Sequence, residues 1–244
     1  MRAEHLKIES IPAMLWGRPE DRGIIAVHGS QSHKADEPIR ILAENAVAAG
    51  YQVLSFDLPG HGDRRHEDTP CRPRECVAEL ATVMAWARSQ WRFVSLFANS
   101  LGVYYSLMAY SGEPLERAWF LSPLVDMQRM IENMMAWSGV TGEQLRREQA
   151  VATPIGQTLY WDDYTEARQH PVSVWPIPTE ILYGEKDGTC ERGTVEAFAA
   201  RFSSGLTVVP DGEHYFHTPE QLRAFDTWLK QTGLGRDKKR PAAP

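Results

Sequence analysis

The sequence has little cysteine: Cys71, Cys76 and Cys190 are the only three among 244 residues. Three scattered thiols are too few for a disulfide framework, and their odd number leaves at least one of them free. They favour a reducing compartment, so we expect a cytoplasmic protein. His61 and His66 lie close to the first two cysteines, but the spacing H-x4-H-x4-C-x4-C matches no structural zinc pattern well. We therefore expect no metal site.

The sequence also lacks an excess of basic residues and any long apolar run. Lys and Arg number 26 against 32 Asp and Glu, and this formal net charge of -6 provides no general positive field for nucleic acid or anionic lipid. No stretch approaches the roughly 18 apolar residues of a membrane span, and the N-terminal MRAEHLKIES has no apolar signal core. We expect a soluble protein with no nucleic-acid partner and no membrane span.

Two nucleotide-binding signatures are missing as well. No G-x-G-x-x-G opens a helix after the first long strand, and no P-loop G-x-x-x-x-G-K-[ST] occurs, so the glycines do not indicate a nucleotide cofactor. There is no internal repeat. The 43% hydrophobic and 24% charged residues fit one large α/β domain or a domain with a modest insertion.

Short apolar runs alternate with helical patterns along most of the chain. This alternation is typical of βα units around a mainly parallel sheet. We expect strands at 6–9, 13–17, 24–28, 51–56, 93–97, 117–121, 179–183 and 206–210. We expect helices at 38–50, 74–89, 101–110, 191–202 and 219–230.

The alternation stops after Ser122-Pro123. Residues 124–175 show two or three short helical patterns and no convincing strand, so they form an insertion in a core made of residues 1–123 and 176–231. The last residues, 232–244, lack apolar periodicity, and we expect a disordered, solvated tail. Its basic residues are Arg236, Lys238, Lys239 and Arg240.

The sharpest chemical signal is FANSLG at 97–102, between an expected strand and an expected helix. A turn that lifts a serine hydroxyl above a sheet forces unusual backbone angles on the serine, so small residues are needed two positions before and after it. Ala98 and Gly102 meet this need around Ser100, and the Leu101 N–H at the helix start can point at a developing oxyanion. From this segment alone, Ser100 could also be an ordinary helix N-cap.

With the segments that follow, the sequence resembles the α/β-hydrolase superfamily over residues 20 to 230, apart from the insertion. That family orders its triad as nucleophile, acid, histidine. Here Ser100 is followed by Asp187 in ILYGEKDGTC and by His214 in VVPDGEHYFH, each just past an expected strand. The resemblance implies an α/β-hydrolase fold in which histidine takes the serine proton and the carboxylate orients the histidine.

The base and the acid each have a rival. His217 lies three residues after His214, but it falls at the start of the last expected helix. Asp126 follows the preceding strand, from which some α/β-hydrolases recruit their acid. We favour Asp187 because the G-E-K-D-G turn places it at the carboxyl end of a strand, where open α/β sheets build their sites.

The loop after the first long strand, VHGS, resembles the His-Gly oxyanion segment of the family. By position we assign the second oxyanion donor to the backbone N–H of Ser30, with Gln31 as the alternative, and we interpret His28 as a buried structural residue. FDLPGHGDR resembles another hallmark loop of the family, and its prolines and glycines favour turn formation over catalysis.

In this family an insertion at this point usually forms a helical cap over the active site. Segment 124–175 contains four of the eight methionines and three of the eight tryptophans. A helix over 125–137 aligns one apolar stripe, which core packing alone would also explain: Met127, Met130, Ile131 and Met134. We expect part of the cap to line the pocket for an apolar or aromatic ester through Met130, Met134, Trp137 and Trp161.

These features predict a cofactor-free serine hydrolase that cleaves carboxylic esters of small or medium size through an acyl-enzyme. A thioesterase, an amidase or an acyltransferase would use the same triad, and C–C hydrolases, lyases and haloperoxidases share the fold. A non-catalytic relative is disfavoured because all three triad residues are present. The sequence is compatible with a monomer or a homodimer.

Overall fold

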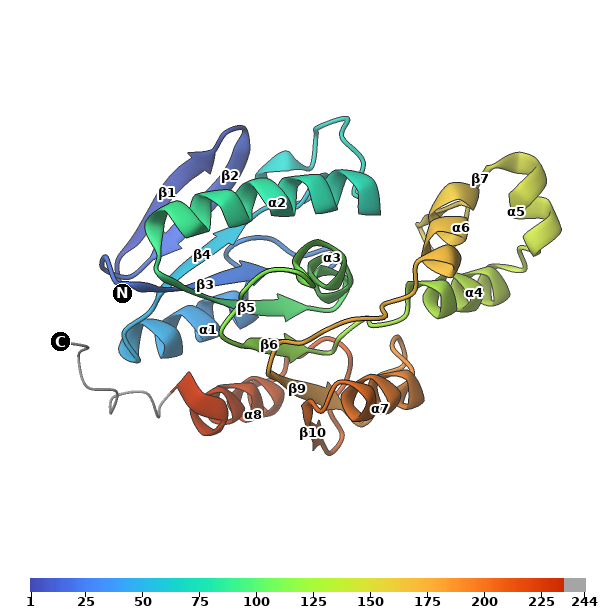
Figure 1. Ribbon diagram of the computed structural model, residues 1–244. Helices are drawn as coiled ribbons and strands as arrows, with labels where there is room; N and C mark the ends of the chain where they lie inside the picture. Colours follow the sequence, from blue (N-terminus) through green and yellow to red (C-terminus); the bar gives the residue numbers. More distant parts are fainter. Residues whose placement is uncertain (235–244) are drawn as a thin grey trace.

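A mixed eight-stranded sheet forms the centre of the molecule (Figure 1). In the computed structural model, which describes residues 1–234, the strand order is β1-β2-β4-β3-β5-β6-β9-β10. The strands are β1 (Ala3–Ile8), β2 (Ile11–Trp16), β3 (Arg22–Val27), β4 (Gln52–Phe56), β5 (Phe93–Asn99), β6 (Ala118–Leu121), β9 (Thr179–Gly184) and β10 (Gly205–Val209). All neighbours from β4 to β10 pair in parallel, and β2 pairs antiparallel with β1 and β4. The predicted mainly parallel α/β sheet is confirmed.

Helices cover both faces of this sheet, as alternating βα units require. The apolar faces of α1 (Glu37–Ala48) and α8 (Pro219–Leu229) pack on one side. On the other side lie α2 (Pro73–Gln90), α3 (Leu101–Tyr110) and α7 (Arg192–Arg201). Because the parallel strands point the same way, the loops that follow β3, β5, β9 and β10 meet at one edge of the sheet.

The segment between β6 and β9 extends away from the sheet as a separate lobe, which we call the α4–α6 segment (Figure 1). It contains α4 (Met127–Ser138), α5 (Gly142–Glu148), β7 (Ala150–Ala152), β8 (Thr158–Tyr160) and α6 (Trp161–Gln169). The expectation of no strand here was wrong, since β7 and β8 pair antiparallel. Each strand has only three residues, too few for an alternating pattern to show in the sequence.

The disorder expected for residues 232–244 was wrong for the first three of them, residues 232–234. Lys230–Leu234 continue the chain after α8 through a kink at Thr232 and Gly233. Leu234 is buried against the core, and Arg117 Nη1 donates a hydrogen bond to the Thr232 carbonyl at 3.3 Å. An apolar side chain four residues beyond the expected helix thus still packs on the core. The rest of the predicted tail, with its four basic residues, lies outside the described residues.

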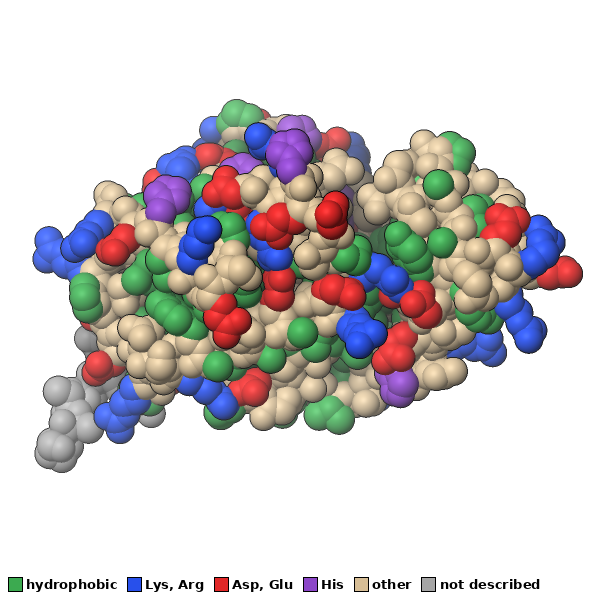
Figure 2. Space-filling model, turned by 90° about the horizontal axis from the view of Figure 1, so that it is seen from above, with side chains coloured by type: hydrophobic (Ala, Val, Ile, Leu, Met, Phe, Trp, Pro, Cys, Tyr) green, Lys and Arg blue, Asp and Glu red, His purple; other side chains and the backbone are tan. Residues whose placement is uncertain are grey.

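The surface carries charges of both signs. On the face seen in Figure 2, acidic and basic side chains alternate without a large patch of one sign, and a hollow separates the main body from the projecting lobe. Within residues 1–234, no helix combines the length and apolar character that crossing a bilayer requires.

Candidate active site

Ser100 occupies a strained turn between β5 and α3. Its backbone has φ 50° and ψ -117°, a left-handed conformation that a residue with a Cβ adopts only under constraint. Hydrogen bonds supply the constraint: the Ser100 N–H donates to the Leu121 carbonyl at 3.0 Å, and the Ser100 carbonyl accepts from Leu124 N at 3.2 Å. A Cβ on Gly102 would lie 2.4 Å from the His28 carbonyl oxygen, so only glycine fits there.

The Ser100 hydroxyl lies at the end of a chain of hydrogen bonds. Its Oγ is 2.8 Å from His214 Nε2, and His214 Nδ1 is 2.8 Å from Asp187 Oδ2. Within the described residues, the hydroxyl makes no cap hydrogen bond to α3, so the N-cap alternative does not account for its position. The structure brings together the three residues that the sequence predicted to act together.

Two loops dock against each other to set this geometry. Asp187 follows β9 and His214 follows β10, which are neighbouring parallel strands. A Cβ on Gly184 would lie 2.5 Å from the Gly212 carbonyl oxygen, and Lys186 N donates to that oxygen at 2.7 Å. The close backbone contact holds the two side chains at hydrogen-bonding distance.

The Asp187 carboxylate is buried and fully engaged. Its side chain has 0% exposure, whereas that of His214 has 22%. Oδ1 accepts from the backbone N–H groups of Thr189 and Cys190 at 2.8 and 2.9 Å, which leaves Oδ2 for His214. Backbone donors of this kind fix the orientation of a buried carboxylate.

The loop after β3 passes directly beside Ser100. A Cβ on Gly29 would lie 3.0 Å from the Ser100 Cβ, and the exposed Ser30 follows it. On the other side, Leu101 is the first residue of α3, where a backbone N–H has no intrahelical acceptor. Of the two predicted oxyanion donors, Leu101 thus directly follows the serine in the chain and Ser30 belongs to the loop beside it. Their role stays a prediction.

His28 is fully buried behind this loop. Its Nε2 accepts the Leu58 N–H at 3.0 Å, and its Nδ1 pairs with the Gly29 carbonyl at 2.7 Å. Burial lowers the pKa of His28 to about 4, although the hydrogen bond to Gly29 partly opposes this effect. His28 is therefore neutral at physiological pH and connects the loop to the chain after β4.

Comparisons with known proteins agree with this arrangement. Residues 24–225 match the alpha/beta hydrolase family. The chain belongs to that family. A "probable serine hydrolase" of Drosophila melanogaster is 24% identical over 238 residues, which cover 93% of this chain and 61% of the relative. The chain thus spans about three fifths of the length of that curated relative.

Solved structures of other α/β hydrolases superpose on most of the chain. Est1E from Butyrivibrio proteoclasticus, with ferulic acid bound, has a TM-score of 0.77 at 18% identity, covering 95% of this chain and 98% of that one. The alpha/beta hydrolase domain-containing protein 10 from mouse has a TM-score of 0.73 at 15% identity, with coverages of 95% and 98%. At such identities the likeness establishes the fold alone.

The rival residues lie elsewhere in this α/β hydrolase. Asp126 is the N-cap of α4, where its Oδ1 accepts the Arg129 N–H at 2.9 Å. His217 is half exposed, and its Nδ1 pairs with the Tyr215 carbonyl at 2.6 Å. It is thus Asp187 that contacts His214, and Asp126 serves the helix start.

The four residues predicted to line a pocket lie in different environments. Met130 is buried and Met134 partly buried against the core, while Trp161 packs on Tyr164 with ring centroids 5.7 Å apart. Trp137 is 54% exposed. Met135, rather than Met134, completes the buried stripe of α4.

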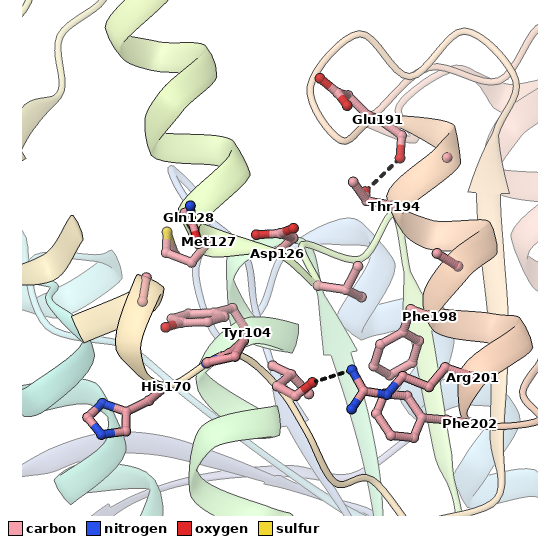
Figure 3. A pocket seen from close by; sticks show the side chains of 16 residues that line it. Tyr104, Asp126, Met127, Gln128, His170, Glu191, Thr194, Phe198, Arg201 and Phe202 are labelled. Atoms are coloured by element: carbon pink, nitrogen blue, oxygen red, sulfur yellow. Dashed lines mark hydrogen bonds between the residues drawn. The ribbon is translucent and has the colours of Figure 1, made fainter. Parts of the chain in front are cut away.

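A cavity of about 420 Å³ lies between the α4–α6 segment and α7 (Figure 3). Phe198 on α7 and Phe202 at its C-terminal end line one side of it, and Tyr104 on α3 lines another (Figure 3). Its lining includes Asp126 but, among the described residues, neither Ser100 nor any of the four predicted pocket residues. The sequence signal that was missed is the spacing of two phenylalanines one helical turn apart on α7.

A metal ion is a poor fit beside Ser100. Asp187, Cys190 and His214 offer ligand atoms within 4.8 Å of one another. However, both Asp187 oxygens already accept hydrogen bonds, and burial raises the pKa of the Cys190 thiol, which therefore stays protonated. The residues present suit a hydrogen-bonded relay better than a cation.

Proposed function

We propose that this α/β hydrolase is a serine esterase in which Ser100, His214 and Asp187 form the catalytic triad. The observation that carries the proposal is the unbroken chain of two 2.8 Å hydrogen bonds from the Ser100 hydroxyl through His214 to the buried Asp187. A serine hydroxyl is a poor nucleophile at neutral pH unless a base takes its proton, and this geometry supplies the base.

Each residue has a distinct task in the proposed mechanism. As Ser100 Oγ attacks the ester carbonyl, His214 Nε2 takes its proton, and Asp187 stabilises the resulting imidazolium. The N–H groups of Ser30 and Leu101 hold the developing oxyanion. His214 then returns the proton to the leaving alcohol. Water next attacks the acyl-enzyme, with His214 again taking the proton and returning it to Ser100 Oγ.

The α4–α6 segment serves as the cap, and the cavity beneath it accepts part of an apolar or aromatic ester. Tyr104 lies one helical turn after Ser100 on α3, and Val125 follows Leu124, whose N–H binds the Ser100 carbonyl. The cavity wall thus begins next to the serine. Its aromatic lining suits an aromatic acyl group, and the structurally similar Est1E binds ferulic acid.

A fluorophosphonate probe tests the nucleophile, and p-nitrophenyl esters of increasing chain length test the activity. We expect stoichiometric labelling of Ser100 and ester turnover, and a loss of kcat of about 10⁴- to 10⁶-fold in Ser100→Ala. Ser89→Ala, at an exposed serine on α2, is the matched control and should retain full activity. Turnover that survives in Ser100→Ala would overturn the assignment.

The class of acyl bond is tested separately with matched p-nitrophenyl ester, thioester and anilide substrates of the same acyl group. We expect the highest kcat/KM for the ester. A thioester or anilide preference by tenfold or more would retain the triad but replace the proposed activity.

A further inference from the structure

A second cluster of reactive side chains lies outside the Ser100 site, at the start of α2. Cys71 directly precedes the N-cap residue Arg72, and Cys76 is the fourth residue of the helix. Side chains at these two positions face each other across a helix start. Both thiols are free, and their Sγ atoms are 3.7 Å apart.

The two thiols differ in their surroundings. Cys76 is fully buried, whereas Cys71 is partly exposed. The Tyr105 hydroxyl lies 3.8 Å from the Cys71 sulfur and donates to the Cys71 carbonyl at 3.1 Å. Cys71 is thus the thiol that a small reagent reaches first, with Cys76 directly behind it.

His61 provides a basic partner for Cys71. Its Nδ1 pairs with the Pro59 carbonyl at 2.8 Å, so Nε2 is the ring nitrogen left to interact with Cys71. Burial lowers the pKa of His61, but its hydrogen bonds to Cys71 and to Pro59 outweigh burial and raise it. The hydrogen bond from Cys76 and that from His61 together lower the pKa of Cys71, against the effect of burial.

We propose that Cys71 and Cys76 form an oxidation-sensitive dithiol, which a hydroperoxide converts to an intramolecular disulfide. The Cys71 thiolate attacks the peroxide, so that an S–O bond forms, the O–O bond breaks, and water or an alcohol leaves after protonation. Cys76 then attacks the sulfenic sulfur, the S–S bond forms, and the second oxygen leaves as water. Two thiols lose two electrons and two protons, and the hydroperoxide gains them.

Cys190 provides an internal comparison. It is buried, no other cysteine of the described chain contacts it, and burial raises the pKa of its thiol. A thiol in such a setting is inert. The difference between the two environments predicts selective chemistry at Cys71.

The test uses the reduced full-length protein treated with one equivalent of hydrogen peroxide and analysed by intact mass and peptide mapping. We expect the loss of two hydrogen atoms, a Cys71–Cys76 crosslink within one chain, and recovery of both thiols with dithiothreitol. Cys76→Ser should instead accumulate Cys71 sulfenic acid, trapped by dimedone, and Cys71→Ser should resist the oxidant. Oxidation spread over all three cysteines, or disulfides only between chains, would overturn the proposal.

A milder pair of variants tests the role of His61 without removing a thiol. At pH 7, iodoacetamide should alkylate Cys71 first, and His61→Gln should slow that reaction about tenfold. His66→Gln, at an exposed histidine in the same loop, is the matched control and should leave the rate unchanged. Equal rates in both variants would contradict an activating His61.

Tight Zn²⁺ binding by the reduced protein, lost in both Cys71→Ser and Cys76→Ser, would identify a metal site in place of the dithiol.

Discussion

The sheet core and the α4–α6 segment hold their residues in place by different means. Around Ser100 the chain is fixed by close backbone contacts, such as those at Gly102 and Gly184, and by buried strands on both sides. The α4–α6 segment is attached to the core partly through ion pairs, Arg72 with Asp163 on one side and Arg129 with Glu191 on the other.

This difference matches the demands placed on each region. Groups that transfer protons must hold their geometry to within a fraction of an ångström, and dense packing achieves this. Exposed ion pairs contribute little individually, so these attachments resist local opening less than dense packing does. We therefore expect substitutions in the core to affect the rate of the chemical step and those in the segment to affect substrate entry.

The largest expected difference between the two regions is that between substitutions of Asp187, in a core loop, and of Asp126, at the start of the α4–α6 segment. Asp187→Asn should lower kcat about 10⁴-fold, because an amide cannot stabilise the His214 imidazolium or fix its tautomer. Asp126→Asn should change kcat by less than about threefold, because asparagine is an equally good N-cap for α4. Steady-state kinetics on one p-nitrophenyl ester measures both. Equal losses, or a larger loss for Asp126→Asn, would reverse the assignment of the acid.

The buried His28 makes the core sensitive to acid. The pKa of His28 is about 4 in the folded state against 6.5 in the unfolded chain, so between these values the unfolded chain binds more protons. The stability that neutral His28 provides is complete above pH 6.5 and is lost as the pH falls towards 4. The loss amounts to about 3 kcal/mol of unfolding free energy.

Urea unfolding of the parent and of His28→Gln between pH 4 and 7 measures this contribution. Glutamine can still accept the Leu58 N–H but does not titrate, so its unfolding free energy should depend less steeply on pH. His66→Gln should keep the slope of the parent. Parallel slopes for the parent and His28→Gln would show that His28 does not cause the acid sensitivity.

The strands and the serine turn were predictable because their signals are local. A buried run such as IIAVH and the small residues around Ser100 report the sheet and the turn within a few positions. Ser100, Asp187 and His214 could be predicted as a set because each follows a recognisable strand. In the structure, Ser100 Oγ and Asp187 Oδ2 each lie 2.8 Å from a ring nitrogen of His214.

The sequence was less informative about the α4–α6 segment, where contacts depend on how elements meet in space. Trp137 is apolar and aromatic yet 54% exposed, because it falls on the outer face of α4. The cavity is lined by α7 and α3 together with other residues of the segment, such as Met127 and Ala167, and nothing in the sequence indicates that these elements meet there. Periodicity shows which side of a helix is apolar, but it does not show which neighbour covers that side.

The attachment of the segment gives the smallest expected effect. Arg72 donates two hydrogen bonds to Asp163, at 3.0 and 2.9 Å, and its guanidinium lies 4.1 Å from the centre of the Tyr160 ring. Arg72→Ala removes a contact between α2 and α6, and because the pair is partly exposed the global unfolding free energy should fall by only about 1 kcal/mol. The free energy of local opening of the α4–α6 segment should fall by a larger fraction, because this contact joins the segment to the sheet core.

Hydrogen exchange and kinetics read out that local effect in Arg72→Ala. Amides of α6 should exchange severalfold faster while those of β5 stay unchanged, and KM for long-chain esters should shift more than kcat. Arg74→Ala, at an exposed arginine two residues away, is the matched control and should match the parent in both measurements. If exchange in β5 rises together with that in α6, the segment and the core unfold as one unit, and the distinction between the two regions fails.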